Sequence, residues 1–280
     1  ITRKGEWLEK GFTKSPQKAL EGVDVVFIAL HGEYGEDGRV QRELQRLGLP
    51  FTGSNALASA TAFNKVFTKD VLRSHNVRMP KHRRLRKDEV TISDEFLNEL
   101  HTSLGEELFI KPTTSGSSHG ARYVGNKDIL NRSLTELFEQ YDELMVEEFI
   151  RGKEATVGII ESFRNQPKYV LPVIEIVPPM GEPLFSYENK YNGKTDEICP
   201  GRFSYHEKSK LSEAALIVHD ALRCSHYSRS DFIVRNGEVY FLEINTLPGL
   251  TDESLLPKAA AAVGLSYADL IRHLVETARP

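Results

Sequence analysis

An Asn-Gly pair at 236–237 lies between two strand-like runs, and this stretch constrains the fold more than any other. Asn-Gly between β-rich segments is the strongest short signal for a β-hairpin. Side chains alternate between the two faces of a strand, so residues two apart share a face. Arg229 therefore shares a face with Asp231 on the first arm. On the second arm, Glu243 shares a face with Asn245.

The type of turn decides whether these two polar pairs meet. A strict two-residue turn pairs Arg235 with Glu238 and puts Asp231 and Glu243 on opposite faces of the hairpin. A three-residue loop, with the glycine left-handed in a G1 bulge, pairs Val234 with Glu238 and brings both polar pairs to one face. The sequence alone does not decide between these two turns.

The bulged turn would create a site for a hard cation. Asp231, Glu243 and Asn245 would then offer three oxygen donors without histidine or thiol, which suits Mg²⁺ better than Zn²⁺. The alternative is a solvated face with a weak Arg229–Asp231 ion pair. Glu243 favours the metal site because it sits in an apolar run, where a carboxylate needs a partner. This metal prediction requires the bulged turn.

Length and composition limit the number of domains and the class of protein. The 280 residues suggest two domains, or three small ones, at roughly 150 residues per domain. The longest apolar run, 23–30, is far shorter than the ~20 residues of a membrane helix. Two cysteines, Cys199 and Cys224, suit a reducing compartment, so we expect a cytoplasmic protein. The basic cluster at 81–87 has no interleaved aromatic residue and reads as a solvated loop rather than a nucleic-acid patch.

Hydrophobic periodicity predicts an α/β start followed by α+β segments with antiparallel sheets. We expect a buried strand at 23–30 and helices at 40–47 and 56–74, the latter capped by Ser54 or Asn55. The other predicted elements are helices at 96–104, 129–141 and 212–223 (capped by Ser212), two closing helices, and strands at 108–111, 121–124, 144–150, 155–161 and 169–177. Because the chain starts at Ile1 and reaches a strong strand only at 23, we expect a first strand and helix to be missing.

Several other residues are candidates for binding an anion. The loop 111–120 has small residues and glycines that let backbone N–H groups approach a phosphate, although it is no Walker A loop and an ordinary hairpin would look similar. Lys111 either points at a ligand or lets its ammonium reach solvent. Lys65 alone would suggest a solvated helix face. His31 follows the end of a predicted strand, where open α/β sheets bind ligands, but it also fits a plain loop histidine.

Taken in order, the motifs resemble those of the D-alanine–D-alanine ligases of the ATP-grasp superfamily. The resemblance covers nearly the whole chain from His31 onward. It rests on the segments at 30–38 (LHGEYGEDG), 51–54 (FTGS), 64–65 (NK), 111–120 (KPTTSGSSHG), 146–154 (VEEFIRGKE), 187–191 (YENKY), 199–200 (CP), 229–231 (RSD) and 243–251 (EINTLPGLT), with Ser254.

The resemblance implies an ATP-grasp fold of three domains, with the nucleotide between two antiparallel sheets. We expect an N-terminal domain at 1–64, a central domain at 65–147 and a C-terminal domain at 148–280 that carries a lid loop at 183–202. It also implies ATP and two Mg²⁺ ions as cofactors, with Mn²⁺ as a substitute. Two D-alanines would be the substrates, for peptidoglycan precursor synthesis. No nucleic-acid or membrane partner is implied, and a homodimer is compatible.

The family's site residues map onto this chain one by one. Those implied to bind the nucleotide are Lys65, Lys111 and Ser118 (phosphates), Lys190 (γ-phosphate), Glu147, Glu148 and Ile150 (adenine), and Glu154 (ribose). Those implied to serve catalysis or the substrates are Ser117 and Tyr191 (substrate side), His31 (catalytic), Arg229 and the Gly249 N–H (oxyanion), and Ser254 and Leu255 (second substrate). Those implied to hold the metal are Asp231, Glu243 and Asn245.

The chain also departs from the family pattern. It shows no counterpart of the N-terminal glutamate that grips the first substrate, and without one we expect ligation to be crippled. Residues 121–123 (Ala-Arg-Tyr) and Arg202 differ from the usual types. Alternatives are a D-alanine–D-lactate or D-alanine–D-serine ligase, another carboxylate–amine ligase, or an ATP-grasp protein that binds nucleotide without ligating. Tyr191 favours the dipeptide product.

Overall fold

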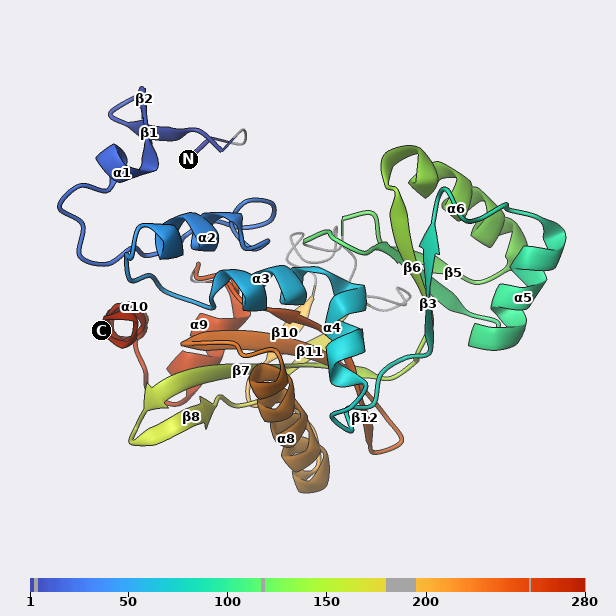
Figure 1. Ribbon diagram of the computed structural model, residues 1–280. Coiled ribbons are helices and arrows are strands. Elements are labelled where there is room, and N and C mark those ends of the chain that lie inside the picture. The colour runs from blue at the N-terminus through green and yellow to red at the C-terminus, as the bar shows by residue number, and fades with distance from the viewer. Residues whose placement is uncertain (3–4, 117–118, 180–194, 252, 280) are drawn as a thin grey trace.

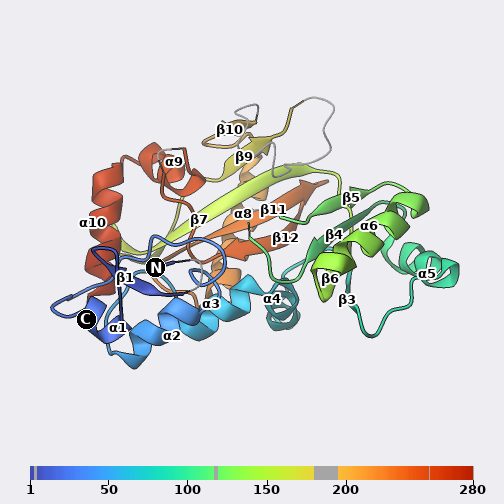
Figure 2. The same cartoon turned by 90° about the horizontal axis from the view of Figure 1, so that it is seen from above.

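Two antiparallel sheets of unequal size, each backed by helices, make up most of the molecule in the computed structural model (Figure 1). The structure describes residues 1–2, 5–116, 119–179, 195–251 and 253–279. The smaller body holds a four-stranded sheet and the larger body a six-stranded one. Seen from above, the two bodies lie side by side, and α4 (Lys65–Leu72) lies where they meet (Figure 2).

The four-stranded sheet presents one apolar face and one polar face. Its order is β3-β6-β4-β5, and all neighbours are antiparallel. The strands are β3 (His82–Arg86), β4 (Leu108–Pro112), β5 (Arg122–Val124) and β6 (Glu143–Glu148). On one face, Ile110 and Val146 pack with α5 (Asp94–Leu104) and α6 (Lys127–Gln140). Alternation then turns Lys111 and Glu147 to the opposite face.

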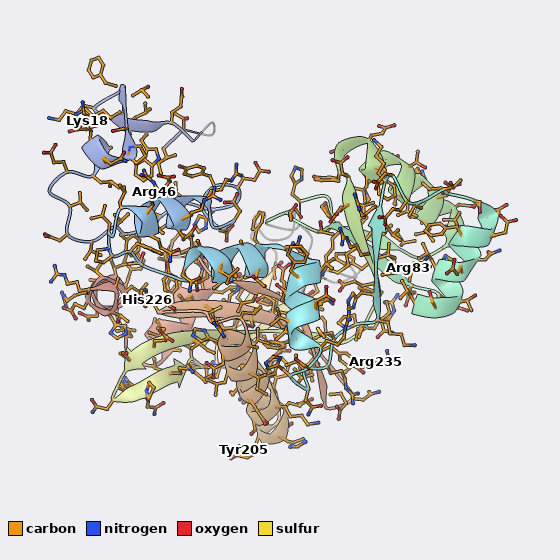
Figure 3. All side chains as sticks on the ribbon, viewed as in Figure 1. Lys18, Arg46, Arg83, Tyr205, His226 and Arg235 are labelled. Atoms are coloured by element: carbon orange, nitrogen blue, oxygen red, sulfur yellow. The ribbon has the colours of Figure 1, made fainter. Side chains whose placement is uncertain are left out.

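The basic cluster 81–87 forms β3 instead of the expected loop. Its guanidinium groups already have carboxylate partners: Arg83 Nη1 lies 2.7 Å from Glu99 Oε1, and Arg84 pairs with Glu143. Figure 3 shows Arg83 on the small body, beside α5. Strand formation follows from pairing with β6, a tertiary contact that the local charge pattern does not reveal.

The six-stranded sheet is covered on both faces. Its order is β10-β9-β7-β11-β12, and β8 pairs with β7. The strands are β7 (Lys153–Phe163), β8 (Gln166–Val170), β9 (Ile174–Val177), β10 (Asp196–Ile198), β11 (Tyr227–Arg235) and β12 (Glu238–Asn245). Ile159 packs in the cluster that includes α8 (Tyr205–Ala221). Ile160 joins the opposite cluster, with α9 (Leu255–Ala262) and α10 (Tyr267–Ala278). The single strand expected at 169–177 is thus two strands, β8 and β9.

The N-terminal part contains short elements around α2 (Arg39–Arg46), which was expected. They are β1 (Trp7–Glu9), β2 (Phe12–Lys14) and α1 (Pro16–Ala19). The buried strand expected at 23–30 was wrong: within the described residues this segment makes one parallel bridge, Val26 to Phe51, and only Ile28 in it is buried. A single bridge is too little pairing for a ladder, which a buried parallel strand needs on its sides.

Two helix boundaries also differ from expectation. The helix expected at 56–74 is two helices, α3 (Ala56–Phe63) and α4, because Asn64 leaves helical geometry with ψ 108° and caps α4. α8 begins after Ser204 rather than Ser212, since Ser204 and Glu207 form a capping box.

The three-domain division at 64 and 147 stays a prediction. Within the described residues, no helix has the length and apolar character needed to cross a membrane.

Candidate active site

The hairpin β11–β12 closes with the two-residue turn, not with the three-residue loop on which the metal prediction depended. Asn236 and Gly237 both have positive φ, 53° and 74°, as a type I′ turn requires. Arg235 pairs directly with Glu238, and the register continues without a shift to Phe232 opposite Phe241. Figure 3 shows Arg235 near the tip of this hairpin.

A β-bulge further along the hairpin nevertheless brings the polar residues together. The register shifts between Asp231 and Phe232, which leaves Leu242 as the extra residue on β12. Beyond it, Asp231 lies opposite Glu243 and Arg229 lies opposite Asn245. One extra residue restores the parity wherever it is inserted between turn and site. The shared face is therefore present, although the three-residue turn that the metal prediction required is not.

Asp231 is held on both oxygens by neighbouring donors. Arg229 donates from Nε to Oδ1 (3.0 Å) and from Nη2 to Oδ2 (2.9 Å), and Thr156 on β7 donates to Oδ1 at 2.5 Å. Burial alone would lower the pKa of Arg229, but the charge and hydrogen bonds of Asp231, together with the charges of Glu243 and Glu36, raise the pKa overall. Arg229 is thus a fixed cation at the site.

The donor set fits a hard cation. A carboxylate offers about four lone-pair sites, so three accepted bonds leave Asp231 a free site on Oδ2. Glu243 lies opposite, and Lys65 Nζ is 3.9 Å from its Oε2. Asn245 Oδ1 accepts the Leu247 N–H at 2.9 Å and keeps its second lone pair. Two carboxylates and an amide are Mg²⁺ ligands by type. Across the part of the chain that the structure describes, no cluster has three or more His, Cys, Asp or Glu placed to hold a metal.

Lys65 enters this site because the helix breaks just before it. The Asn64 side chain accepts the N–H groups of Val66 and Phe67, so α4 starts at Lys65. Lys65 Nζ donates to the Ser115 carbonyl oxygen at 2.6 Å. Its side chain is only 9% exposed, so it does not lie on a solvated helix face.

Glu147 is a buried carboxylate between two lysines. Lys111 Nζ lies 2.6 Å from its Oε2, and Lys69 pairs with its Oε1. Burial would raise the pKa of Glu147, but the two lysines reverse the effect and lower the pKa to about 2. Lys69 was not singled out from the sequence. The available signal was its spacing of four from Lys65, which puts both on one face of α4.

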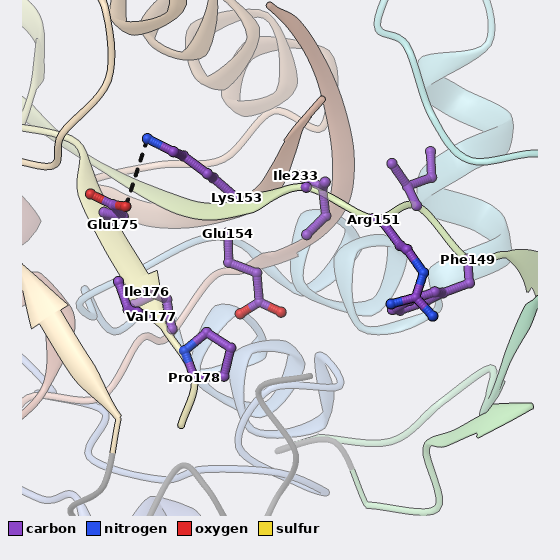
Figure 4. A pocket seen from close by; sticks show the side chains of 11 residues that line it. Phe149, Arg151, Lys153, Glu154, Glu175, Ile176, Val177, Pro178 and Ile233 are labelled. Carbon is purple, nitrogen blue, oxygen red and sulfur yellow. Dashed lines mark ion pairs between the residues drawn. The ribbon is translucent and has the colours of Figure 1, made fainter. Parts of the chain in front are cut away.

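Two neighbouring cavities collect the candidate residues. One, of about 110 Å³, lies between the sheets and is lined from both. Its lining includes Lys65, Phe109, Lys111, Ser115, Glu154, Thr156, Arg229, Asp231, Leu242, Glu243 and Leu255. The other, of about 340 Å³, shares Glu154 and Ile176 with it and is lined by 149–154 and 175–178. Figure 4 shows the side chains that line this cavity, Glu154 among them.

The loop 31–38 reaches the same region. Glu36 accepts the Gly32 N–H, and its Oε2 faces Gly116 of the small-residue loop. Burial raises the pKa of Glu36, and the charge of Glu243 adds to the rise. His31 itself is exposed. From the sequence, Glu36 could help to hold a metal or cap the next helix, and the cap was favoured. The cap was wrong: Gly38 is the N-cap of α2 and no side chain caps it, whereas Glu36 lies beside the site.

Two further predicted residues, Gly249 and Ser254, lie against each other just before α9. A Cβ on Gly249 would lie 2.6 Å from Ser254 Oγ, so a larger residue there would displace the Ser254 side chain. Ser254 Oγ accepts the Thr251 N–H at 3.1 Å. Ser117, Ser118, Lys190, Tyr191 and most of the predicted lid loop 183–202 lie outside the described residues.

Sequence models of a known family match both parts of the chain. The model of the D-ala D-ala ligase C-terminus matches residues 71–276, and that of the D-ala D-ala ligase N-terminus matches residues 2–54. The chain belongs to the D-alanine–D-alanine ligase family. The D-alanine–D-alanine ligase of Leptospira interrogans is 38% identical over 270 residues, which is 95% of this chain and 76% of the relative.

Solved structures of this family share the fold. The crystal structure of the D-alanine–D-alanine ligase of Bacillus anthracis complexed with ATP matches with a TM-score of 0.77 at 36% identity, over 91% of this chain and 79% of that one. The D-Ala:D-Ser ligase VanG of Enterococcus faecalis matches with a TM-score of 0.80 at 31% identity, over 91% and 73%. This member of the D-alanine–D-alanine ligase family therefore has the ATP-grasp fold.

Proposed function

We propose that this protein joins two D-alanine molecules to D-alanyl-D-alanine, with conversion of ATP to ADP and phosphate, for peptidoglycan precursor synthesis. One observation carries the proposal. The cavity between the two sheets brings Lys65, Lys111 and Arg229 together with the facing carboxylates Asp231 and Glu243. Cations beside a pair of metal-ligand carboxylates are what transfer of a phosphoryl group requires.

The chemistry explains these residue types. A carboxylate is a poor acceptor for an amine, so the first D-alanine is activated by phosphorylation to an acyl phosphate, with ADP as leaving group. The amine of the second D-alanine then attacks the acyl carbon, and phosphate leaves. Lys65 and Lys111 would bind and orient the phosphates, which is most of the catalytic task in such a transfer. Arg229 and the Gly249 N–H would stabilise the oxyanion of the tetrahedral intermediate.

Mg²⁺ would be held by Asp231, Glu243 and Asn245. When bound, the ion neutralises phosphate charge and helps to orient the transferred group. The residues themselves provide the preorganisation: Arg229 and Thr156 fix the Asp231 carboxylate before any ligand arrives. Two ions, and Mn²⁺ as a substitute, belong to the same proposal.

Nucleotide and substrate would bind on either side of this metal site. The wider cavity, with Ile150 and Glu154 in its lining, would take the base and ribose. Glu147 and Glu148 would contribute on the same side, at the end of β6. Ser254 and Leu255, at the start of α9, would meet the carboxylate of the second substrate.

Release of ADP tests the proposal. The protein is incubated with ATP, Mg²⁺ and D-alanine at neutral pH, and D-lactate and D-serine are tried as second substrates. We expect release that depends on D-alanine, with the dipeptide as product. Lys65→Met should abolish it. The matched variant Lys210→Met, which removes a partly exposed ion pair to Glu238, should not.

Three results would count against the proposal. Preference for D-lactate or D-serine would change the product. Binding of ATP by calorimetry without any dipeptide would favour a nucleotide-binding protein. Full activity of Lys65→Met would remove the phosphate role of this cavity.

A further inference from the structure

A buried triad of charges at the end of the cavity has one member that the proposed reaction does not use. Glu147 is 2% exposed, and its two oxygens are divided between Lys69 and Lys111. Lys111 lines the cavity between the sheets. Lys69 is 1% exposed and is not part of that lining. Only one of the two lysines, Lys111, therefore lines the cavity.

The two lysines come from different parts of the molecule. Lys111 lies on β4 and Glu147 on β6 of the small sheet, on the face turned away from α5 and α6. Lys69 lies on α4, the helix where the two bodies meet (Figure 2). The ion pair between Lys69 and Glu147 thus joins α4 to the small sheet.

The charges in this cluster do not balance. Two ammonium groups share one carboxylate, and each lysine opposes the charge of the other. His82, opposite Glu147 on β3, adds no cation near neutral pH, because burial and the nearby Lys69 lower its pKa. Glu147 can therefore keep one cation when the accessible one moves toward an anion in the cavity.

Lys111 can turn to a nucleotide only if Glu147 keeps a counter-ion. A buried carboxylate that loses its only cation is strongly disfavoured. We propose that Lys69 is a positioning residue for nucleotide binding: it holds Glu147 when Lys111 leaves that carboxylate for the phosphates or base of the nucleotide. This rests on the proposed function, since it assumes that a nucleotide occupies the cavity. Lys69 itself touches neither substrate nor nucleotide.

Replacement of Lys69 by methionine tests the idea. In Lys69→Met, Lys111 becomes the only counter-ion of Glu147 and is retained by it. We expect the Kd for ATP, measured by calorimetry without D-alanine, to rise about tenfold or more. The KM for ATP should rise with it, while kcat at saturating ATP stays within about threefold, because the cost of moving Lys111 falls on binding and the saturated complex has the same groups on the nucleotide. Lys210→Met is the matched control and should bind ATP like the unchanged protein.

Removal of the carboxylate separates positioning from mere structural support. In Glu147→Gln there is no charge for Lys69 to neutralise, so adding Lys69→Met to it should change the Kd by less than about threefold. The double variant should also bind ATP more tightly than Lys69→Met alone. If Lys69→Met fails to fold, the comparison of the double variant with Glu147→Gln still decides, because the double variant loses a cation and an anion together and keeps the net charge of the cluster.

The outcomes separate this inference from the proposed function. If the unchanged protein binds no ATP, the proposed function fails first. If it binds ATP and Lys69→Met binds equally well, only the positioning role is wrong. A further tenfold loss on adding Lys69→Met to Glu147→Gln would also overturn it, because the effect of Lys69 would then not act through Glu147.

Discussion

Asp231→Asn is the sharpest test of the metal site, because it changes one atom in a known set of contacts. Asp231 accepts two hydrogen bonds from Arg229 and one from Thr156. Asparagine keeps one oxygen and presents an NH₂ group in place of the other. At least one bond to the guanidinium is then lost, and so is the negative charge beside it.

The cost to stability follows from these contacts. A hydrogen bond to a charged group contributes about 1.5–3 kcal/mol, and removal of a partner from a fully buried pair costs about 3–5 kcal/mol. The Arg229 side chain is 15% exposed, so water replaces part of what is lost. We expect the free energy of unfolding to fall by about 2 kcal/mol. A typical domain has about 5–15 kcal/mol to lose, so the variant should remain folded.

The cost to activity should be much larger. The substitution removes one of the two negative charges that would bind Mg²⁺, and a metal ion is worth several kcal/mol in such a transition state. At 1.36 kcal/mol per tenfold, we expect ADP release to fall by about 100-fold or more at fixed Mg²⁺.

Titration of ADP release against Mg²⁺, with urea unfolding monitored in parallel, measures both quantities. Glu238→Gln in the same hairpin is the matched control. It removes ion pairs to Lys210 and Arg78 that are about 40% exposed on the Glu238 side, and such pairs contribute at most about 1 kcal/mol. Wild-type Mg²⁺ dependence in Asp231→Asn would refute the metal assignment. Complete unfolding would refute the estimate of the contacts.

Three further predictions concern the elements around the site. Asn64→Ala removes the cap of α4, so thermal unfolding should show a loss of about 1 kcal/mol, and the KM for ATP should rise because Lys65 follows the cap. The Gly53 N–H donates to His226 Nδ1, and burial lowers the His226 pKa below 6.5. The neutral imidazole therefore contributes stability that is fully present above pH 6.5 and is lost as the pH falls below 6.5. Urea titrations below pH 6.5 should show a smaller loss of stability in His226→Gln than in the unchanged protein. Deletion of Leu242 removes the bulge and turns Glu243 to the opposite face, so Mg²⁺-dependent ADP release should vanish, whereas Leu242→Ala, which retains the bulge, should keep the Mg²⁺ dependence.

Local sequence signals were sufficient where the decisive contacts are local. Asn-Gly at 236–237 predicted the hairpin, because both residues tolerate the positive φ of the turn. Strand alternation then predicted that Arg229 and Asp231 share a face, and that face lines the cavity. The helices α5 and α6 were found close to their observed bounds because apolar residues recur along one side.

The bulge shows where local signals fail. Leu242 is an apolar residue in an apolar strand, and nothing in its type distinguishes a bulged position from a regular one. Its place is decided by what each register buries: Phe232 meets Phe241 on the turn side, and Asp231 meets Glu243 beyond it. Asp231 and Glu243 still share a face, because one extra residue anywhere between the turn and this pair has that effect.

Lysines in α4 were the least predictable part of the site for a related reason. A lysine on a helix normally lies in solvent. Lys69 is buried only because the four-stranded sheet, from a later part of the chain, contacts α4. Glu147 supplies the reason in this case. A carboxylate on the inner face of β6 must be neutralised when the two bodies come together, and the residues within reach are Lys111 on the sheet and Lys69 on the helix. The burial of these charges therefore depends on how α4 and the small sheet come together. Predicting it from the sequence would require knowing beforehand that β6 contacts α4.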